Sequence, residues 1–268
     1  MRAPALLLAA CFSLAPFGAG SAETSSFVAT RRVNVSLAFS GQRVFLYGEA
    51  PEGTVRVVSV IEGPTGSPVR LLQKGRVAFF WLGVRQYRLG GVPGLYLVDA
   101  NCPLCNRPSD CPHATDEASW NRVLAPLGYA AGRSALRDRA DLECLSGPLK
   151  NGELDTVLNG YWEVQAGRGL FAVKGNAVRL NAARSYYHTF SLPPQSPDGR
   201  YLIATYFLSG DSLLAVEGNE LFVRKAGLIA TLSRLAEKRA AVYGVVTILI
   251  ALAAGWVAGT LFRRGGGH

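Results

Sequence analysis

The sequence predicts a mainly β protein, namely an immunoglobulin-like antiparallel β-sandwich with an α-helical insertion and a C-terminal transmembrane helix. Three observations carry this prediction. Short segments of alternating apolar and polar residues occupy both halves of the chain, a stretch with helix-like spacing separates them, and an uncharged apolar run lies near the end. With 268 residues, of which 49% are hydrophobic, the chain can bury one sizeable core or at most two small ones.

The first 22 residues have the layout of a secretory signal peptide. Arg2 forms a short positive region, the run from Ala5 to Phe17 is apolar, and small residues lead up to Ala22. We therefore expect the mature chain to begin near Glu23 and to be exported. A rival prediction is a lipoprotein signal, because Cys11 follows Leu-Ala-Ala. The short apolar run before Cys11 favours the first prediction.

Residues 31–99 read as a series of short strands. Apolar residues alternate with Asn34 and Ser36 from Val33 to Phe39, which is the period of a half-buried strand. Turn-forming pieces such as Pro51-Glu52-Gly53 separate it from the strands that follow. These further strands are expected at Arg43–Tyr47, Thr54–Ile61 and Val77–Tyr87. Close spacing of this kind favours antiparallel pairing in a sandwich.

Between about residues 100 and 169 the alternation stops, and helix-like spacing predicts an inserted helical segment. Asp116 suits the first turn of a helix, where an acidic side chain meets free backbone N–H groups. The helices are expected at Thr115–Leu127, Arg133–Leu145 and Leu149–Val164.

Strands resume after the insertion and complete an exported body at 23–226. Before one of them, residues 197–201 resemble the corner of an immunoglobulin-like sandwich, where the hydroxyl of Tyr201 can bond back to the backbone. We expect the early and late strands to pack together in one sandwich, with two smaller domains as the alternative. The late strands are expected at Leu170–Leu180, Ser185–Leu192, Tyr201–Leu208 and Ser212–Lys225.

The C-terminal region predicts a membrane anchor. A juxtamembrane helix at 227–239 leads into Ala240–Phe262, a run of 23 residues without a charge. A helix of that length crosses a hydrocarbon layer of about 30 Å. The signal peptide exports the preceding body, so residues 263–268 are expected in the cytoplasm and the body in the periplasm of a bacterial inner-membrane protein. Within the span, Ala251, Gly255 and Gly259 form one face of small residues on which another helix can pack.

Several short patterns together resemble the alphaproteobacterial putative transmembrane protein family. They include Phe39-Ser40-Gly41, Glu62-Gly63-Pro64, Arg76-Val77 with Trp81, Gly255-Trp256 and Phe262-Arg263-Arg264. The resemblance spans nearly the whole mature chain, and it implies a signal, an exported body and a terminal anchor. It also implies a partner, because members are often encountered beside permeases of the sulfite-exporter type. The cysteine-rich segment departs from the family pattern, so a role for those cysteines is particular to this chain.

Reactive side chains are concentrated in a cysteine segment of the insertion. If Cys11 leaves with the signal, four cysteines remain in an oxidising compartment, and an even number predicts two disulfides. Two alternatives stay open: a zinc site that includes either His113 or Cys144, and thiol-disulfide chemistry at the Cys-Pro-Leu-Cys pair. The cysteines concerned are Cys102, Cys105, Cys111 and Cys144.

The remaining sequence features argue against several classes of protein. The formal charge of +9 is scattered and not interleaved with aromatic residues, which argues against nucleic-acid binding. His188 lies in an expected strand, where a solvent-facing or core-edge position is the ordinary explanation, and no nucleophile-base motif surrounds it. The sequence therefore favours a non-enzymatic accessory or binding protein, held in the lipid bilayer, that contacts an integral membrane partner. A periplasmic thiol-redox or metal-binding protein is the alternative.

Overall fold

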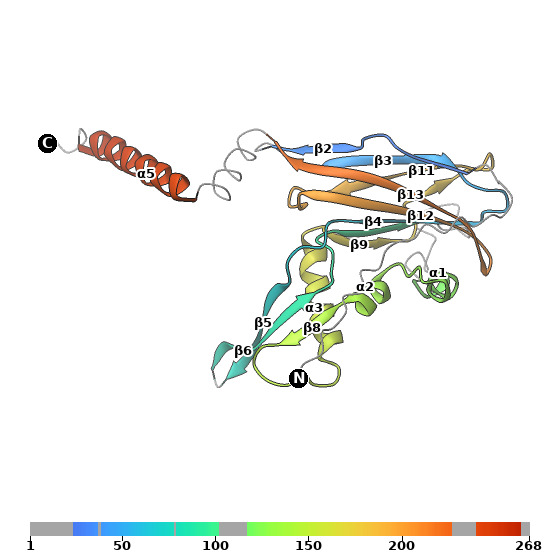
Figure 1. Cartoon of the computed structure of the whole chain (residues 1–268), viewed down its shortest axis with the longest axis horizontal. Coiled ribbons are helices and arrows are strands. Elements are labelled where there is room, and N and C mark those ends of the chain that lie inside the picture. The colour runs from blue at the N-terminus through green and yellow to red at the C-terminus, as the bar shows by residue number, and fades with distance from the viewer. Residues whose placement is uncertain (1–23, 37–38, 78, 102–116, 227–239, 264–268) are drawn as a thin grey trace, which may run out of the picture.

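The structure is a computed structural model that describes residues 24–36, 39–77, 79–101, 117–226 and 240–263. Strands predominate in these ranges (Figure 1), which confirms the mainly β class. The strands are β1 (Ser25–Val28), β2 (Arg32–Val35), β3 (Gln42–Glu49), β4 (Arg56–Glu62), β5 (Val69–Val77), β6 (Phe80–Gly90), β7 (Tyr96–Ala100), β8 (Asp141–Cys144), β9 (Phe171–Lys174), β10 (Arg179–Leu180), β11 (Ser185–Leu192), β12 (Gly199–Ser209) and β13 (Ser212–Lys225). The helices are α1 (Glu117–Leu124), the 3₁₀ helix η2 (Ala125–Leu127), α2 (Arg133–Arg139), α3 (Glu153–Gly167) and α5 (Ala240–Arg263).

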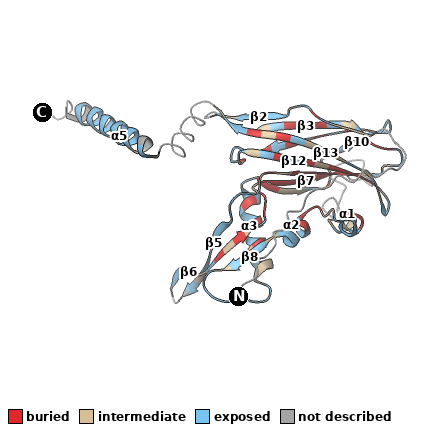
Figure 2. Cartoon of the chain, in the orientation of Figure 1, coloured by how far each residue is buried: buried red, intermediate tan, exposed pale blue. Residues whose placement is uncertain are grey.

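Two sheets enclose the main core. One has the strand order β1-β3-β11-β10, and the other has the order β2-β13-β12-β4-β7-β9. Their inner faces meet where the rings of Tyr186 and Phe207 lie 5.3 Å apart in an edge-on arrangement. β7 is buried along its whole length, and it is red in Figure 2. Burial of both faces explains why its sequence, Tyr96 to Ala100, shows little alternation.

The early and late strands pair with each other, as the sequence predicts. β3 pairs with β11, β4 with β12, and β2 with β13. The expectation of purely antiparallel sheets is wrong at two places, because β2–β13 and β7–β9 are parallel. In both pairs a long piece of chain separates the two strands, and such a connection lets a second strand run in the same direction as the first.

A third sheet, of order β5-β6-β8, projects from the two-sheet body (Figure 1). Its last strand corrects the predicted helix at Arg133–Leu145, because α2 ends at Arg139 and the chain then becomes extended. In this strand Leu142 and Cys144 alternate with exposed acidic residues, and it pairs with the end of β6 at Tyr87–Gly90. The free edge of β6 thus determines the conformation of these residues.

The other two helices of the insertion form close to their predicted positions. α1 with η2 ends at Leu127 as expected, and α3 runs three residues past the predicted end at Val164. α3 is held against the six-stranded sheet by an aromatic cluster in which the ring of Trp162 contacts those of Phe171, at 5.2 Å, and Tyr96, at 6.4 Å. These contacts hold the insertion beside β7 and β9.

The predicted tyrosine corner is present. The hydroxyl of Tyr201 donates a hydrogen bond of 2.6 Å to the backbone oxygen of Pro197. An immunoglobulin-like sandwich is built from antiparallel sheets, whereas the sandwich of this protein contains two parallel pairs. The structure therefore does not confirm the immunoglobulin-like topology as a whole, which stays a prediction.

The predicted C-terminal segment is helical and forms α5, whose described side chains are almost all exposed (pale blue in Figure 2). Among the residues that the structure describes, no helix meets the combined requirement of length and apolarity for crossing a membrane. The predicted signal peptide at 1–22, the juxtamembrane helix at 227–239 and most of the tail lie outside the described residues.

Candidate functional site

Of the predicted cysteine site, the structure describes only Cys144. Cys102, Cys105 and Cys111, and His113 with them, lie outside the described residues. Cys144 ends β8, is partly exposed, and makes no disulfide with any described residue. The two predicted disulfides therefore stay a prediction.

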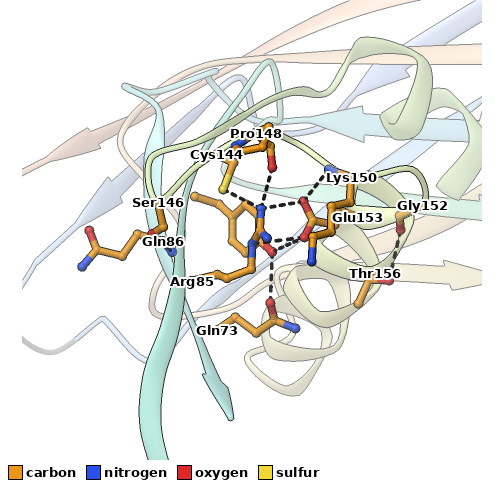
Figure 3. Close-up of polar contacts among 11 residues, drawn as sticks. Gln73, Arg85, Gln86, Cys144, Ser146, Pro148, Lys150, Gly152, Glu153 and Thr156 are labelled. Atoms are coloured by element: carbon orange, nitrogen blue, oxygen red, sulfur yellow. Dashed lines mark hydrogen bonds and ion pairs between the residues drawn. The ribbon is translucent and has the colours of Figure 1, made fainter.

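Cys144 belongs to a polar cluster between the projecting sheet and α3, which we call the Arg85 cluster (Figure 3). It consists of Gln73, Arg85, Tyr87, Cys144 and Glu153. Nη2 of Arg85 donates to the sulfur of Cys144 at 3.1 Å, and its Nε lies 3.1 Å from Oε1 of Glu153. The same guanidinium donates to the backbone oxygen of Pro148 at 2.8 Å. Arg85 thus joins β6 to the end of β8 and to the first turn of α3.

Tyr87 forms the second half of the Arg85 cluster. Its ring is buried, and its hydroxyl lies 3.1 Å from Oε1 of Glu153 and 3.0 Å from Oε1 of Gln73. Burial is the main reason why the pKa of Tyr87 is raised above its usual value. The phenol therefore stays protonated and donates a hydrogen bond to the carboxylate at neutral pH.

The carboxylate of Glu153 accepts bonds from three directions. The backbone N–H of Lys150 donates to Oε2 at 2.9 Å, and this bond is the largest cause of a lowered pKa of Glu153. Tyr87 and Arg85 lower that pKa further. The pKa of Arg85 is raised, first by its hydrogen bond to Cys144. The cluster therefore stays ionised and intact at neutral pH, and it holds a guanidinium against a thiol.

A second polar arrangement crosses the interior of the sandwich. In the six-stranded sheet Thr205, Ser59 and Asp99 are neighbours in register on β12, β4 and β7, and all three are buried. The hydroxyls of Ser59 and Thr205 lie 2.7 Å apart. From the opposite sheet, Nδ1 of His188 lies 3.5 Å from a carboxylate oxygen of Asp99.

The position of His188 corrects the sequence-based interpretation of a solvent-facing or core-edge residue. Its side chain is fully buried, and its ring lies edge-on to that of Phe190 at 4.6 Å. Neither ring nitrogen has a hydrogen-bond partner within the described part of the chain. The alternation of β11 fixes this orientation, because Tyr186, His188 and Phe190 occupy every second position on its inner face.

Asp99 also lines a pocket of about 490 Å³ at the edge of the sandwich. The pocket lies between the start of β3, the end of β11 and the pair β7–β9. Arg43 and Lys174 contribute positive charge to its wall, and Phe171 and Phe190 contribute apolar surface. A cleft with a buried carboxylate and two cations can hold a small polar molecule, and the sequence contains no motif that indicates it.

The turn of the β5–β6 hairpin exposes large apolar side chains, which the sequence analysis missed. Phe79 is 86% exposed, and Phe80 and Trp81 are each 70% exposed. The signal for it is the unbroken run Phe79-Phe80-Trp81-Leu82, which lacks the alternation of a half-buried strand.

Ala251, Gly255 and Gly259 follow one another at intervals of four residues in α5. A Cβ atom added to Gly255 or Gly259 would meet no described atom within 4 Å. The packing of another helix on this face stays a prediction. No group of three or more His, Cys, Asp or Glu side chains in the described ranges is placed to hold a metal ion.

The comparisons with known proteins give one match. The family described as "Putative transmembrane protein (Alph_Pro_TM)" matches residues 25–264, which include the whole described β body and α5. No curated protein and no solved structure matches the chain. The match covers far more than half of the sequence, as the resemblance of its short patterns predicts. The chain therefore belongs to the Alph_Pro_TM family of putative transmembrane proteins.

Proposed function

We propose that this protein is a non-enzymatic accessory or binding protein of the bacterial inner membrane. In this proposal α5 crosses the membrane once, the immunoglobulin-like β body lies in the periplasm, and the residues after Arg263 lie in the cytoplasm. The family match supports a place in the membrane, and the signal-like first 22 residues support export of the body.

The observation that carries the proposal is the surface of α5. The helix has 24 residues, and the segment Ala240–Phe262 within it has no charge. Large apolar side chains are exposed along one side of it and small residues occupy the other side, so it has no charged face to turn toward water. These exposed side chains are Val245, Val246, Ile248, Leu249, Ile250, Leu252, Trp256 and Val257. An all-apolar helix of this length is stable where lipid covers it.

The partner in this proposal is an integral membrane protein that packs on the small-residue face of α5. Without a hydrophobic driving force between helices in lipid, close backbone approach at small residues is the main source of specific association. The family resemblance points to a permease of the sulfite-exporter type as the partner. The β body then steadies the partner on its periplasmic side, and the Asp99 pocket offers it a place for a small polar ligand.

Co-purification in a mild detergent tests this proposal. Wild-type protein is expected to carry a stoichiometric membrane protein, and Gly255→Leu is expected to lose it because the new side chain keeps the helices apart. Ala253→Leu is the matched control, since it adds an apolar side chain two residues away, on the opposite side of α5. Recovery of the wild-type chain alone, or equal loss with both variants, contradicts the proposed interface.

A second candidate function is thiol-redox or metal chemistry. The observation that favours it is the Arg85 guanidinium 3.1 Å from the sulfur of Cys144, because a positive neighbour is typical of reactive cysteines. Thiol titration and elemental analysis of the purified protein distinguish the two functions. If the protein holds two permanent disulfides and no metal, the redox or metal function is excluded. If its thiols react fast or it binds zinc, that function is favoured over the accessory function.

A further inference from the structure

The β5–β6 hairpin is apolar on both of its faces near the turn. Residues directly opposite each other in an antiparallel pair project from the same face, and neighbours along a strand project from opposite faces. Trp81 pairs with Arg76, whereas Leu82 pairs with Gly75, so Trp81 and Leu82 lie on different faces. Phe80, one residue before Trp81, lies on the face of Leu82.

Only two residues separate the strands at this turn, because Val77 pairs with Phe80. Phe79 therefore lies at the extreme end of the hairpin and is the most exposed of the large apolar residues that the structure describes. Phe79, Phe80, Trp81 and Leu82 together form what we call the aromatic tip. A partner that covers one flat face of the hairpin would leave the other face of the aromatic tip in water.

The hairpin behind the aromatic tip is basic. Residues 69–90 contain five Arg and Lys residues and no Asp or Glu. The two nearest the aromatic tip are Lys74 and Arg76, both exposed, and Arg76 lies directly opposite Trp81. Glu143 and Glu153 bond Arg88 and Arg85, which are farther from the turn. Two exposed basic residues thus lie directly behind the apolar end of the hairpin.

We propose that the aromatic tip inserts into the interfacial layer of an anionic phospholipid bilayer. Aromatic rings, tryptophan above all, prefer the level of the lipid headgroups, and basic side chains just outside that level attract anionic headgroups. A fluid bilayer surrounds an inserted end, so it covers both faces of the aromatic tip at once. This chemistry favours lipid over a protein with a single docking face.

The geometry of the hairpin limits the depth of insertion. Among the described strands none pairs with the outer edge of β5, and β8 pairs with β6 only from Tyr87 onward. Open strand edges are not tolerated in the hydrocarbon core, where no water or headgroup can satisfy their N–H and C=O groups. The aromatic tip therefore reaches the headgroup and upper acyl level and stops there. In Figure 1 the hairpin points down and to the left, away from the two-sheet body.

Quenching of tryptophan fluorescence by brominated lipids tests the proposal in the full-length protein. The chain has four tryptophans, of which Trp120 and Trp162 are buried in the body. Wild type and Trp81→Phe are reconstituted into phosphatidylcholine vesicles with and without phosphatidylglycerol, both carrying brominated acyl chains. The difference between the two proteins isolates Trp81. It is expected to be quenched when phosphatidylglycerol is present, and this quenching is expected to be lost in Lys74→Glu/Arg76→Glu.

The control variant Arg122→Glu/Arg168→Glu removes the same charge from exposed positions on α1 and after α3, and it is expected to keep the quenching of Trp81. Trp256→Phe reports α5 separately, because Trp256 lies in that helix. Quenching of Trp256 without quenching of Trp81 would overturn this inference, while the proposed membrane anchor α5 would be supported. Shielding of Trp81 only when other membrane proteins are present also overturns it, in favour of a protein partner.

Discussion

The hydroxyl of Tyr201 bonds the backbone oxygen of Pro197 at a distance of 2.6 Å, four residues upstream of it in the chain. The tyrosine ring is completely buried, so the bond fixes the turn at 197–201 to the core of the sandwich just as β12 begins. Burial raises the pKa of Tyr201, and the phenol keeps its proton and the bond at neutral pH.

Tyr201→Phe removes this bond while keeping the ring. Since the Pro197 oxygen loses its partner, we expect the free energy of unfolding to fall by about 1 kcal/mol. Urea denaturation of the protein in detergent, followed by circular dichroism, measures the change. Tyr187→Phe is the control, because Tyr187 is exposed on the outer face of β11, and it is expected to change stability by less than about 0.5 kcal/mol.

The aromatic cluster of α3 predicts a larger effect for Trp162→Ala. Its ring contacts Phe171 and Tyr96, and the guanidinium of Arg133 lies over it at 4.8 Å. Loss of a buried indole is expected to cost about 3–5 kcal/mol. In the same helix Val164→Ala shortens an exposed side chain and is expected to cost very little. Equal stability of the two variants would contradict the packing described for α3.

The Arg85 cluster predicts that the folded protein loses stability at acid pH. The pKa of Glu153 is lower in the folded than in the unfolded chain. Its ionisation therefore contributes fully to the free energy of unfolding above the unfolded pKa of about 4.3. That contribution is lost as the pH falls through the lower, folded value. Glu153→Gln is therefore expected to be less stable than wild type at neutral pH and to lose less stability on acidification through this range.

Glu143→Gln is the matched control for this pH dependence. Glu143 pairs with Arg88 on the same projecting sheet, but both side chains of that pair are well exposed. Its replacement is expected to leave the acid transition of wild type unchanged. Stability curves for Glu153→Gln and wild type that run parallel from neutral pH to about pH 3 would show that Glu153 does not carry the effect.

The environment of the buried His188 predicts that the fold tolerates an apolar residue at this position. Neither nitrogen of His188 is hydrogen-bonded within the described structure, so an apolar replacement loses no such bond there. His188→Leu is expected to change the free energy of unfolding by no more than about 1 kcal/mol in either direction. A loss of about 3 kcal/mol or more, measured by urea denaturation at neutral pH, would instead reveal an ion pair between His188 and Asp99.

Local periodicity was sufficient where a strand has one buried and one exposed face. The predicted bounds of Ser185–Leu192 and Ser212–Lys225 coincide with β11 and β13, and more buried and less buried residues alternate along both strands. The Tyr201 corner was also predictable, since the bond joins groups only four residues apart. These features depend on neighbours in sequence.

Features set by distant parts of the chain were not predictable in this way. Asp141–Cys144 continues a helix-like pattern, and only the free edge of β6 makes it a strand. The partner of Cys144 in the structure is Arg85, which is 59 residues earlier in the chain, and Asp99 meets His188 only across the sandwich. No short motif contains such pairs. The aromatic tip was missed for a different reason, because an apolar run inside an expected strand suggests burial until the hairpin is seen to project.

The most direct test of the central claim, that α5 anchors an exported β body, combines extraction with protease treatment of cells from which the outer membrane has been removed. We expect the protein to stay in the membrane pellet after an alkaline carbonate wash. We also expect external protease to digest residues 24–226 and to leave a C-terminal fragment that contains α5. Release of the chain into the carbonate supernatant, or full protection of the body while a periplasmic marker is digested, would contradict the account.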